Sequence, residues 1–263
     1  MGEGSKIAWT THTFNPWWGC VRVSPGCTNC YAESFDRRVS GVEKAHWGVD
    51  AERREFGDAH WNEPRKWAAA ARKAGVRARV FCASMADYLE DHPTADRLRP
   101  RLFDLVRETA DALDWLLLTK RAERLDLVPM DVRRVAWGLV TAENQEWADR
   151  RVPLLLASEG WKVRGVSYEP AIGPVDWYEY PELDWLIVGG ESGHGARPFD
   201  LAWAHNAIEQ GGIARTAVFV KQLGEVVTMA DGSPAAAFPR IRGKKWDDPG
   251  QWPEDLRVRE FPR

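Results

Sequence analysis

Three cysteines stand close together near the start of the chain, in the stretch "NPWWGCVRVSPGCTNCYAE" over residues 15–33. Cys20, Cys27 and Cys30 follow the spacing C-x6-C-x2-C on a loop that also carries glycine and proline. Such a loop can bend three sulfur atoms toward one point, and thiolates are ligands for soft metal ions and iron–sulfur clusters. The spacing therefore predicts a metal site formed by these three cysteines.

The kind of metal is left open by the cysteines alone. A structural zinc ion takes four protein ligands, whereas a cubane cluster can be held by three cysteines with one iron open. No second C-x-x-C pair occurs, so a closed zinc site would need Cys82, His12 or another distant residue. Cys82 lies in an apolar run, which is typical of an inert buried thiol.

Composition bounds the class of protein. Hydrophobic residues make up 44% of 263 residues, and 36 Lys and Arg against 39 Asp and Glu give a net charge of −3. This balance argues against a protein that mainly coats nucleic acid. No apolar run is long enough to span a membrane and no signal-peptide pattern begins the chain, so we expect a cytoplasmic protein without membrane contact. In that reducing compartment a disulfide is the least favoured reading of the cysteines.

Short apolar runs recur along the chain and are continuous rather than alternating, as in strands buried on both faces of a parallel sheet. They span 78–84, 114–119, 134–140, 162–167, 184–190 and 216–221, with a further strand expected near "THTFNPW". Helical patterns at 94–113, 144–158 and 200–212 separate several of them. The alternation predicts an α/β fold, a partial or complete (β/α) TIM-like barrel with parallel strands.

The ends of two helices are suggested by capping residues. We expect Thr94 to cap the first and Asp200 to cap the third, which the glycines near residue 212 would stop. Asn62 and Pro64 mark the start of another helix.

The domain organisation predicted from these patterns is simple. One barrel domain covers 1–226 and includes an insertion or surface excursion at about 40–76. A C-terminal extension at 227–263, rich in turn residues, packs on the barrel.

Charged and amide side chains follow all six later strands. The active site of parallel α/β folds lies at the carboxyl ends of the strands, so we expect these side chains to line one pocket. They are Asp87, Lys120, Arg121, Glu143, Asn144, Glu169, Glu191, Lys221 and Gln222. Their recurrence favours a polar pocket over ordinary surface polarity.

The stretch "GGESG" at 189–193 is a glycine-rich turn at a strand end. Glycines let a ligand approach the backbone closely and leave N–H groups for a carboxylate or phosphate. Ser192 is not a convincing nucleophile, because the strand–G-x-S-x-G–helix context is missing and no particular histidine, His194 included, can be assigned as its base.

An ordered series of motifs carries a family resemblance. The cysteine string is followed by "SMADYLED", "LLLTKR", "WGLVTAENQEWADRR", "GVSYEPAIGPVDW", "DWLIVGGESGHGARP" and "FVKQLGE". Over about residues 7–226 the chain resembles the phage-associated three-Cys-motif proteins, a radical-SAM-like family of poorly defined function. The resemblance implies a (β/α) barrel whose first loop holds a [4Fe–4S] cluster, with S-adenosylmethionine (SAM) on the open iron. Reduction of such a cluster would cleave SAM to a 5′-deoxyadenosyl radical.

The motif departs from the general radical-SAM pattern at two places. Six residues rather than three separate the first two cysteines, and Asn29 replaces the aromatic residue that usually precedes the last cysteine. The glycine–glycine–glutamate motif follows the sixth strand here and the second strand in the general family.

Residue roles follow from the resemblance. Cys20, Cys27 and Cys30 would ligate iron. Residues expected to bind SAM are Glu143, Arg150, Arg151, Gly189, Gly190, Glu191 and Ser192. Those expected in the substrate cavity are Asp87, Arg121, Asn144 and Gln222, with Lys120, Glu169 and Lys221 as catalytic groups.

Three functions are compatible with the sequence. The first is a radical-SAM-like enzyme in the cytoplasm, or in the host cytoplasm if phage-encoded, acting on a nucleotide or nucleic-acid-related substrate. It would need an external electron donor and could need a partner protein. The second is a metal-binding accessory or scaffold protein with zinc or a redox-silent cluster. The third is a metal-free hydrolase that uses Glu143, Glu169 and Glu191.

Overall fold

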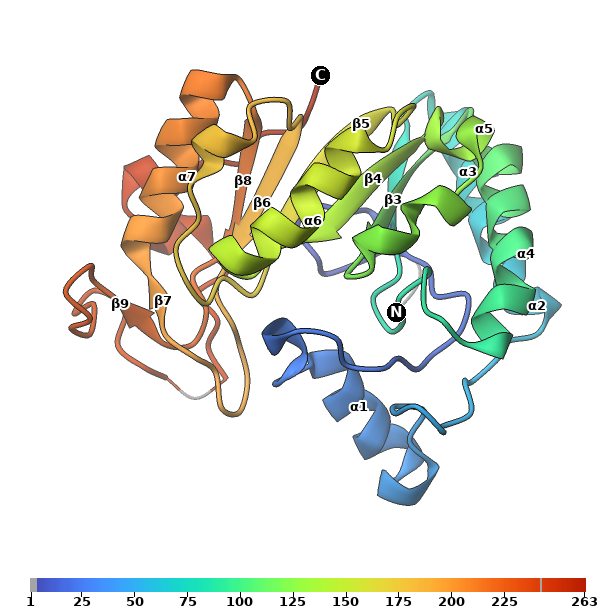
Figure 1. Cartoon of the computed structure of the whole chain (residues 1–263), viewed down its shortest axis with the longest axis horizontal. Helices are drawn as coiled ribbons and strands as arrows, with labels where there is room; N and C mark the ends of the chain where they lie inside the picture. The colour runs from blue at the N-terminus through green and yellow to red at the C-terminus, as the bar shows by residue number, and fades with distance from the viewer. Residues whose placement is uncertain (1–3, 242) are drawn as a thin grey trace. The chain divides into compact units, whose positions relative to one another are not determined.

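The computed structural model describes residues 4–241 and 243–263 (Figure 1). Seven parallel strands form one sheet in the order β1-β2-β3-β4-β5-β6-β8. The strands are β1 (His12–Thr13), β2 (Ala78–Cys82), β3 (Leu113–Thr119), β4 (Ala136–Thr141), β5 (Val163–Tyr168), β6 (Trp185–Gly189) and β8 (Ala217–Gln222). Because this order follows the chain and leaves β1 and β8 as edges, the sheet is that of a partial (β/α) barrel. The predicted fold class and all seven predicted strands are confirmed.

The strands form because their apolar runs are buried on both faces. Val80 pairs with Trp115 and Phe81 with Leu116 across β2 and β3, and all four side chains are buried. The same holds where Leu186 of β6 faces Val218 of β8. Continuous burial explains why the runs lack the alternation of a half-exposed sheet.

Helices connect the strands. They are α1 (Tyr31–Ser40), α2 (Asp58–Trp61), α3 (Glu63–Ala74), α4 (Pro93–Thr109), α5 (Met130–Arg133), α6 (Gln145–Ala157) and α7 (Leu201–Ala214). The predicted start of α3 at Asn62 and Pro64 is confirmed, with Asn62 at the N-cap position and Pro64 inside the first turn. Short 3-10 turns complete the described elements: η1 (Pro25–Cys27), η2 (Val42–Lys44), η3 (Ala122–Leu127), η4 (Trp177–Glu179), η5 (Pro249–Gln251) and η6 (Glu254–Leu256).

Two predicted helix ends are wrong. His92, not Thr94, caps α4, because its ring nitrogen accepts a hydrogen bond from the Thr94 N–H at 3.2 Å and Pro93 occupies the first helical position. Asp200 caps α7 as predicted, but the helix continues through its glycines to Ala214. Gly211 serves packing instead, since a Cβ there would lie 2.4 Å from Val218 Cγ2 of β8.

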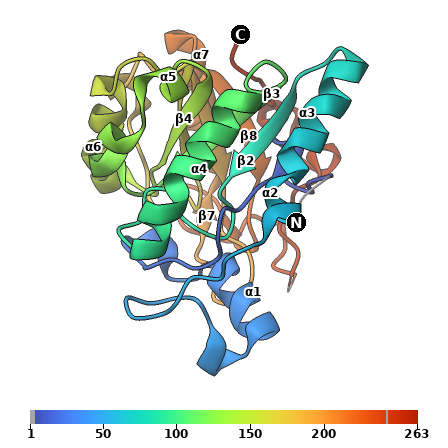
Figure 2. The same cartoon turned by 90° about the vertical axis from the view of Figure 1, so that its right-hand side faces the viewer.

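Contacts divide the chain into two compact units. The first contains Met1–Val23, Cys30–Leu139 and Ser158–Lys162. Within it, α3 packs on β2 and β3 and lies beside α4 (Figure 2).

The second unit contains Ser24–Asn29, Val140–Ala157 and Val163–Arg263. Within it, α7 packs on β6 and β8, and α6 packs on β5 (Figure 1).

The tail after β8 forms the predicted turns and a small ladder. β9 (Val227–Thr228) pairs in parallel with β7 (Phe199–Asp200), and Thr228 forms an antiparallel bridge to Pro234. The last residues return to β8, where the Val220 N–H donates to Val258 O at 2.9 Å. Across the described part of the chain, none of the helices combines the length and the apolar character needed to cross a bilayer.

Candidate functional site

The cysteine loop contributes to both units. Cys20 and Cys30 belong to the first unit and Cys27 to the second. None of the three is in a disulfide and all are half-buried, whereas Cys82 is an unbridged thiol buried in β2. Within residues 4–241 and 243–263, no three His, Cys, Asp or Glu side chains are gathered into a metal site. The donor set itself fits an iron–sulfur cluster, because three unbridged thiols stand within one short loop.

The first-unit end of the loop is fixed by its backbone. The Gly19 N–H donates to Met85 O at 3.0 Å, and the Gly48 N–H donates to Cys20 O at 3.1 Å. Gly19 has a φ of +117°, and a Cβ there would lie 2.2 Å from the carbonyl oxygen of His46. Only glycine can adopt this backbone conformation without a steric clash. Gly19 therefore determines the backbone turn immediately before Cys20.

A guanidinium group lies against Cys20. Arg121, which follows β3, places Nη1 3.7 Å from Cys20 Sγ and donates from Nη2 to Val21 O at 3.1 Å. Burial raises the pKa of the Cys20 thiol to about 12, although the Arg121 charge acts in the opposite direction. The arginine therefore favours the thiolate form that a metal would require.

Asp87 holds that arginine in place. Its carboxylate lies 2.9 Å from Arg121 Nη1 and accepts hydrogen bonds from Thr119 Oγ1 and from the Lys120 and Leu89 N–H groups. Burial raises the pKa of Asp87, but Arg121 and these donors outweigh it and hold the pKa below its usual range. The structure thus brings together the side chains of Asp87 and Arg121, which follow neighbouring strands, while Lys120 joins them through its backbone N–H.

Sequence reasoning missed a buried ion pair beside this group. Arg53 binds both oxygens of Glu90 at 2.9 Å, and Glu90 lies 3.8 Å from Arg121 Nη2. Arg53 also donates to the carbonyl oxygens of His46 and Gly48, both at 3.1 Å. No sequence signal marked Arg53, because the segment around it lacks a strand or helix pattern.

In the second unit, Glu143 binds the segment Ser24–Asn29. This segment carries Cys27 and is called the Cys27 segment below. Glu143 is fully buried at the end of β4. It accepts a hydrogen bond from Ser24 Oγ at 2.6 Å and another from Arg151 Nη1 at 3.0 Å. A Cβ on Gly26 would lie 2.3 Å from Glu143 Oε1, so glycine makes room for the carboxylate.

Glu191 binds the other end of the Cys27 segment. It accepts from Asn29 Nδ2 at 3.0 Å and from Arg197 Nε and Nη2 at 2.8 and 2.7 Å. Arg197 Nη1 also donates to Pro25 O at 3.0 Å. Burial raises the pKa of Glu191, but the bonds from Arg197 and Asn29 outweigh it and lower the pKa. Arg197 and Asn29 carried no predicted role at this site.

Two other residues expected at this site lie elsewhere. Arg150 is exposed on α6, where it pairs with Glu146 at 2.8 Å and lies over the Trp147 ring. Asn144 accepts a hydrogen bond from the Trp147 N–H at 3.2 Å at the start of α6. Glu143 and Arg151 are therefore brought together, while Arg150 and Asn144 have local roles on the helix.

The ends of β5, β6 and β8 meet in a second polar group. Lys221 Nζ lies 2.8 Å from Glu169 Oε1, with both side chains largely buried. Gln222 Nε2 donates to Gly190 O at 2.8 Å. A Cβ on Gly189 would lie 2.6 Å from Glu169 Oε1, and one on Gly190 would lie 2.4 Å from Leu223 O. These glycines thus serve close packing of strand ends.

Ser192 is half-buried in the turn after β6. The parallel sheet, whose strand order follows the chain, and the polar strand ends define an α/β protein of the (β/α)-barrel class with a cysteine-bearing first loop. The chain belongs to the family described as "Protein of unknown function (DUF5131)", whose model matches residues 4–249. Comparison with curated protein sequences gave no match.

Similar solved structures include spore photoproduct lyase complexed with dinucleoside spore photoproduct. It has a TM-score of 0.49 and 15% identity, over 76% of this chain and 58% of that chain. A mutant of that enzyme with bound AdoMet and dinucleoside spore photoproduct has a TM-score of 0.47 and 14% identity, over 71% of this chain and 58% of that chain. This chain spans less than two thirds of the length of those proteins.

Proposed function

We propose that the protein is an iron–sulfur enzyme of the radical-SAM type that acts on a nucleotide or nucleic-acid-related substrate. The observation that carries the proposal is the loop of three half-buried thiols, none of them in a disulfide, that follows β1 of a partial (β/α) barrel. Three cysteine ligands leave one iron of a cubane cluster open. When bound and reduced, such a cluster supplies the electron that cleaves the sulfonium of SAM.

The chain's own residues would hold the loop for this cluster. Arg121 lies against Cys20 and is fixed by Asp87, so it orients the first ligand. Glu143 and Glu191 fix the Cys27 segment. Since the oxygens of both glutamates already accept hydrogen bonds from the protein, their proposed role is to position Cys27. Binding of SAM by Gly189, Gly190, Ser192 and Arg151 remains part of the proposal.

Glu169 and Lys221 are the proposed proton-handling pair. Their 2.8 Å contact lets a proton pass between carboxylate and amine, and their partial burial keeps bulk water away. Lys120 is the third catalytic candidate, placed by the bond from its N–H to Asp87.

Anaerobic reconstitution with iron and sulfide tests the proposal. We expect about four irons per chain, a visible absorption band that reductant bleaches, and 5′-deoxyadenosine when SAM and reductant are added. Stoichiometric zinc without iron would overturn the cluster, and a cluster that binds no SAM would overturn the radical-SAM chemistry.

The chain offers a matched control for the ligands. Replacing Cys20, Cys27 and Cys30 together by alanine should abolish iron binding, whereas Cys82→Ala should keep it, because Cys82 is buried in β2 outside the loop. Retention of fold in the triple variant is read from its circular dichroism. Equal iron in the triple variant and the parent would contradict the assignment.

A further inference from the structure

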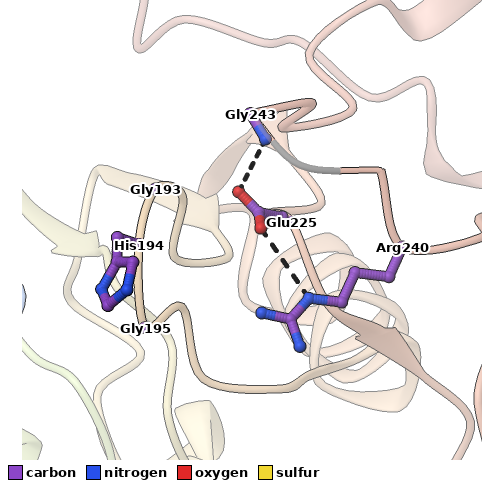
Figure 3. A pocket seen from close by; sticks show the side chains of 6 residues that line it. All are labelled: Gly193, His194, Gly195, Glu225, Arg240 and Gly243. Carbon is purple, nitrogen blue, oxygen red and sulfur yellow. Dashed lines mark hydrogen bonds and ion pairs between the residues drawn. The ribbon is translucent and has the colours of Figure 1, made fainter.

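A pocket in the second unit is lined by residues that the proposed function does not use. It has a volume of about 670 Å³ and is bounded by Gly193, His194, Gly195, Glu225, Arg240 and Gly243. Figure 3 shows Arg240 extending toward Glu225 from one wall, while His194 stands on the loop that forms the other wall. This volume is within the range of pockets that bind small molecules and cofactors.

The cation in this pocket is oriented by a buried carboxylate. The Glu225 side chain is 4% exposed, accepts a hydrogen bond from the Gly243 N–H at 3.0 Å and lies 3.8 Å from Arg240 Nε. Arg240 Nη1 and Nη2 make no hydrogen bond to another described residue, and the side chain is 63% exposed. The buried Glu225 carboxylate therefore orients the Arg240 side chain and leaves its two terminal nitrogens available to a ligand. The two nitrogens of a planar guanidinium match the spacing of phosphate oxygens.

The two walls add to this anion-binding character. The segment that carries Arg240 is locally basic, since Lys244 and Lys245 follow closely in a chain whose net charge is −3. On the opposite wall, Gly193 and Gly195 have φ values of +96° and +79°, so this loop lets a ligand approach its backbone closely. The His194 ring is turned away from Arg240 and Glu225, so this wall faces the pocket with its backbone (Figure 3).

The pocket is joined to the cysteine loop within the same unit. Asn29 Nδ2 donates to Gly195 O at 2.8 Å as well as to Glu191 Oε2 at 3.0 Å. One side chain of the Cys27 segment thus fixes a wall of the pocket. A ligand bound there would lie next to the segment that carries Cys27.

The geometry points to a binding site for the phosphate of a nucleotide or single-stranded nucleic acid, with Arg240 as the phosphate contact and the Gly193–Gly195 loop as the opposite wall. The inference rests on the proposed function and specifies its substrate class. It gives the nucleic-acid-related substrate a defined place in the fold and assigns a role to the C-terminal extension.

The test measures binding of a fluorescein-labelled single-stranded DNA 12-mer to the full chain without metal, by anisotropy at several salt concentrations. Arg240→Ala should weaken binding about tenfold and lower the slope of log affinity against log salt by about one. An unlabelled dinucleotide should displace the probe, and thymidine, which has no phosphate, should not.

Arg97→Ala is the matched control, because Arg97 is similarly exposed at 58% and also pairs with one glutamate, Glu55. It should bind like the parent. Equal losses in the Arg240 and Arg97 variants, an unchanged Arg240 variant, or displacement by thymidine as effective as by the dinucleotide would each overturn the site. Because the protein carries no metal in this assay, failure here is distinct from failure of cluster formation.

Discussion

Asp87 shows how a single carboxylate organises the first-unit part of the site. It is 5% exposed and binds the guanidinium that touches Cys20, together with one hydroxyl and two backbone N–H groups. A buried arginine that loses its acid partner is left as an uncompensated charge. Much of the local structure therefore depends on this one ion pair.

Asp87→Asn should lower the free energy of unfolding by about 3–5 kcal/mol, the usual cost of breaking a buried pair. Urea denaturation followed by tryptophan fluorescence measures it. Asp111→Asn is the control, because Asp111 pairs with Arg72 at the surface and should change stability little. An unchanged urea midpoint for Asp87→Asn would show that the pair is not needed for folding.

Asp114 predicts a pH dependence at the start of β3. It accepts from Arg77 Nε at 3.0 Å and Lys162 Nζ at 2.7 Å. Burial raises the pKa of Asp114, but these two cations outweigh burial and hold the pKa below its ordinary value. Since the folded pKa lies below the unfolded one, the stabilisation is present above about pH 4 and is lost as the pH falls through the folded pKa.

The parent should therefore lose more stability than Asp114→Asn between pH 7 and pH 3, because the variant has no such group to protonate. Unfolding free energies at both pH values provide the comparison. A parent and variant with parallel pH profiles would argue that Arg77 and Lys162 do not stabilise the ionised form.

At the scale of elements, the Cys27 segment is held by strand ends. Glu143 follows β4, Glu191 follows β6, and each accepts a hydrogen bond from a side chain of Ser24–Asn29. The segment itself contains only the short turn η1 (Pro25–Cys27), which buries no residue. Its conformation therefore depends on these two carboxylates.

Asn29→Ala should release the segment, because it removes the bonds to Glu191 and Gly195. We expect iodoacetamide to modify Cys27 several-fold faster in the metal-free variant, as followed by peptide mass spectrometry. Asn62→Ala, at the surface start of α3, should leave the rate unchanged. The same Cys27 rate in all three proteins would mean that Asn29 does not restrain the segment.

At the scale of the whole chain, the C-terminal residues complete the second unit. Glu260 donates its N–H to Val218 O at 2.8 Å and accepts from Trp185 Nε1 at 2.9 Å through its carbonyl. Phe261 lies 5.6 Å from the Trp185 ring and 5.3 Å from the Phe219 ring. The last residues therefore cover aromatic side chains of β6 and β8.

Deleting residues 258–263 should lower the melting temperature by several degrees, since it removes a backbone ladder and exposes Trp185 and Phe219. Differential scanning fluorimetry measures the shift. Deleting Arg263 alone, which is exposed, is the control. A full-length melting temperature in the longer deletion would contradict a packing role for the C-terminus.

The sequence by itself determined the strands, their parallel arrangement and the three-cysteine loop. Continuous apolar runs such as 114–119 have one stable environment, a sheet buried on both faces, so local pattern and tertiary fold agree. The polar residues after these strands were predicted for the same reason, because strand ends of a parallel sheet lie at one edge.

Only the tertiary structure decided the partners of these residues. Glu143 and Glu191 were expected to bind a cofactor, yet they accept hydrogen bonds from Ser24 and Asn29, more than a hundred residues earlier in the chain. Glu90 and Arg53 meet in a buried pair that no local pattern marks. Residues so far apart in the sequence become neighbours only in the folded chain. A charge buried there is costly unless an opposite charge or a hydrogen-bond donor lies beside it, and this cost determines which residues pair.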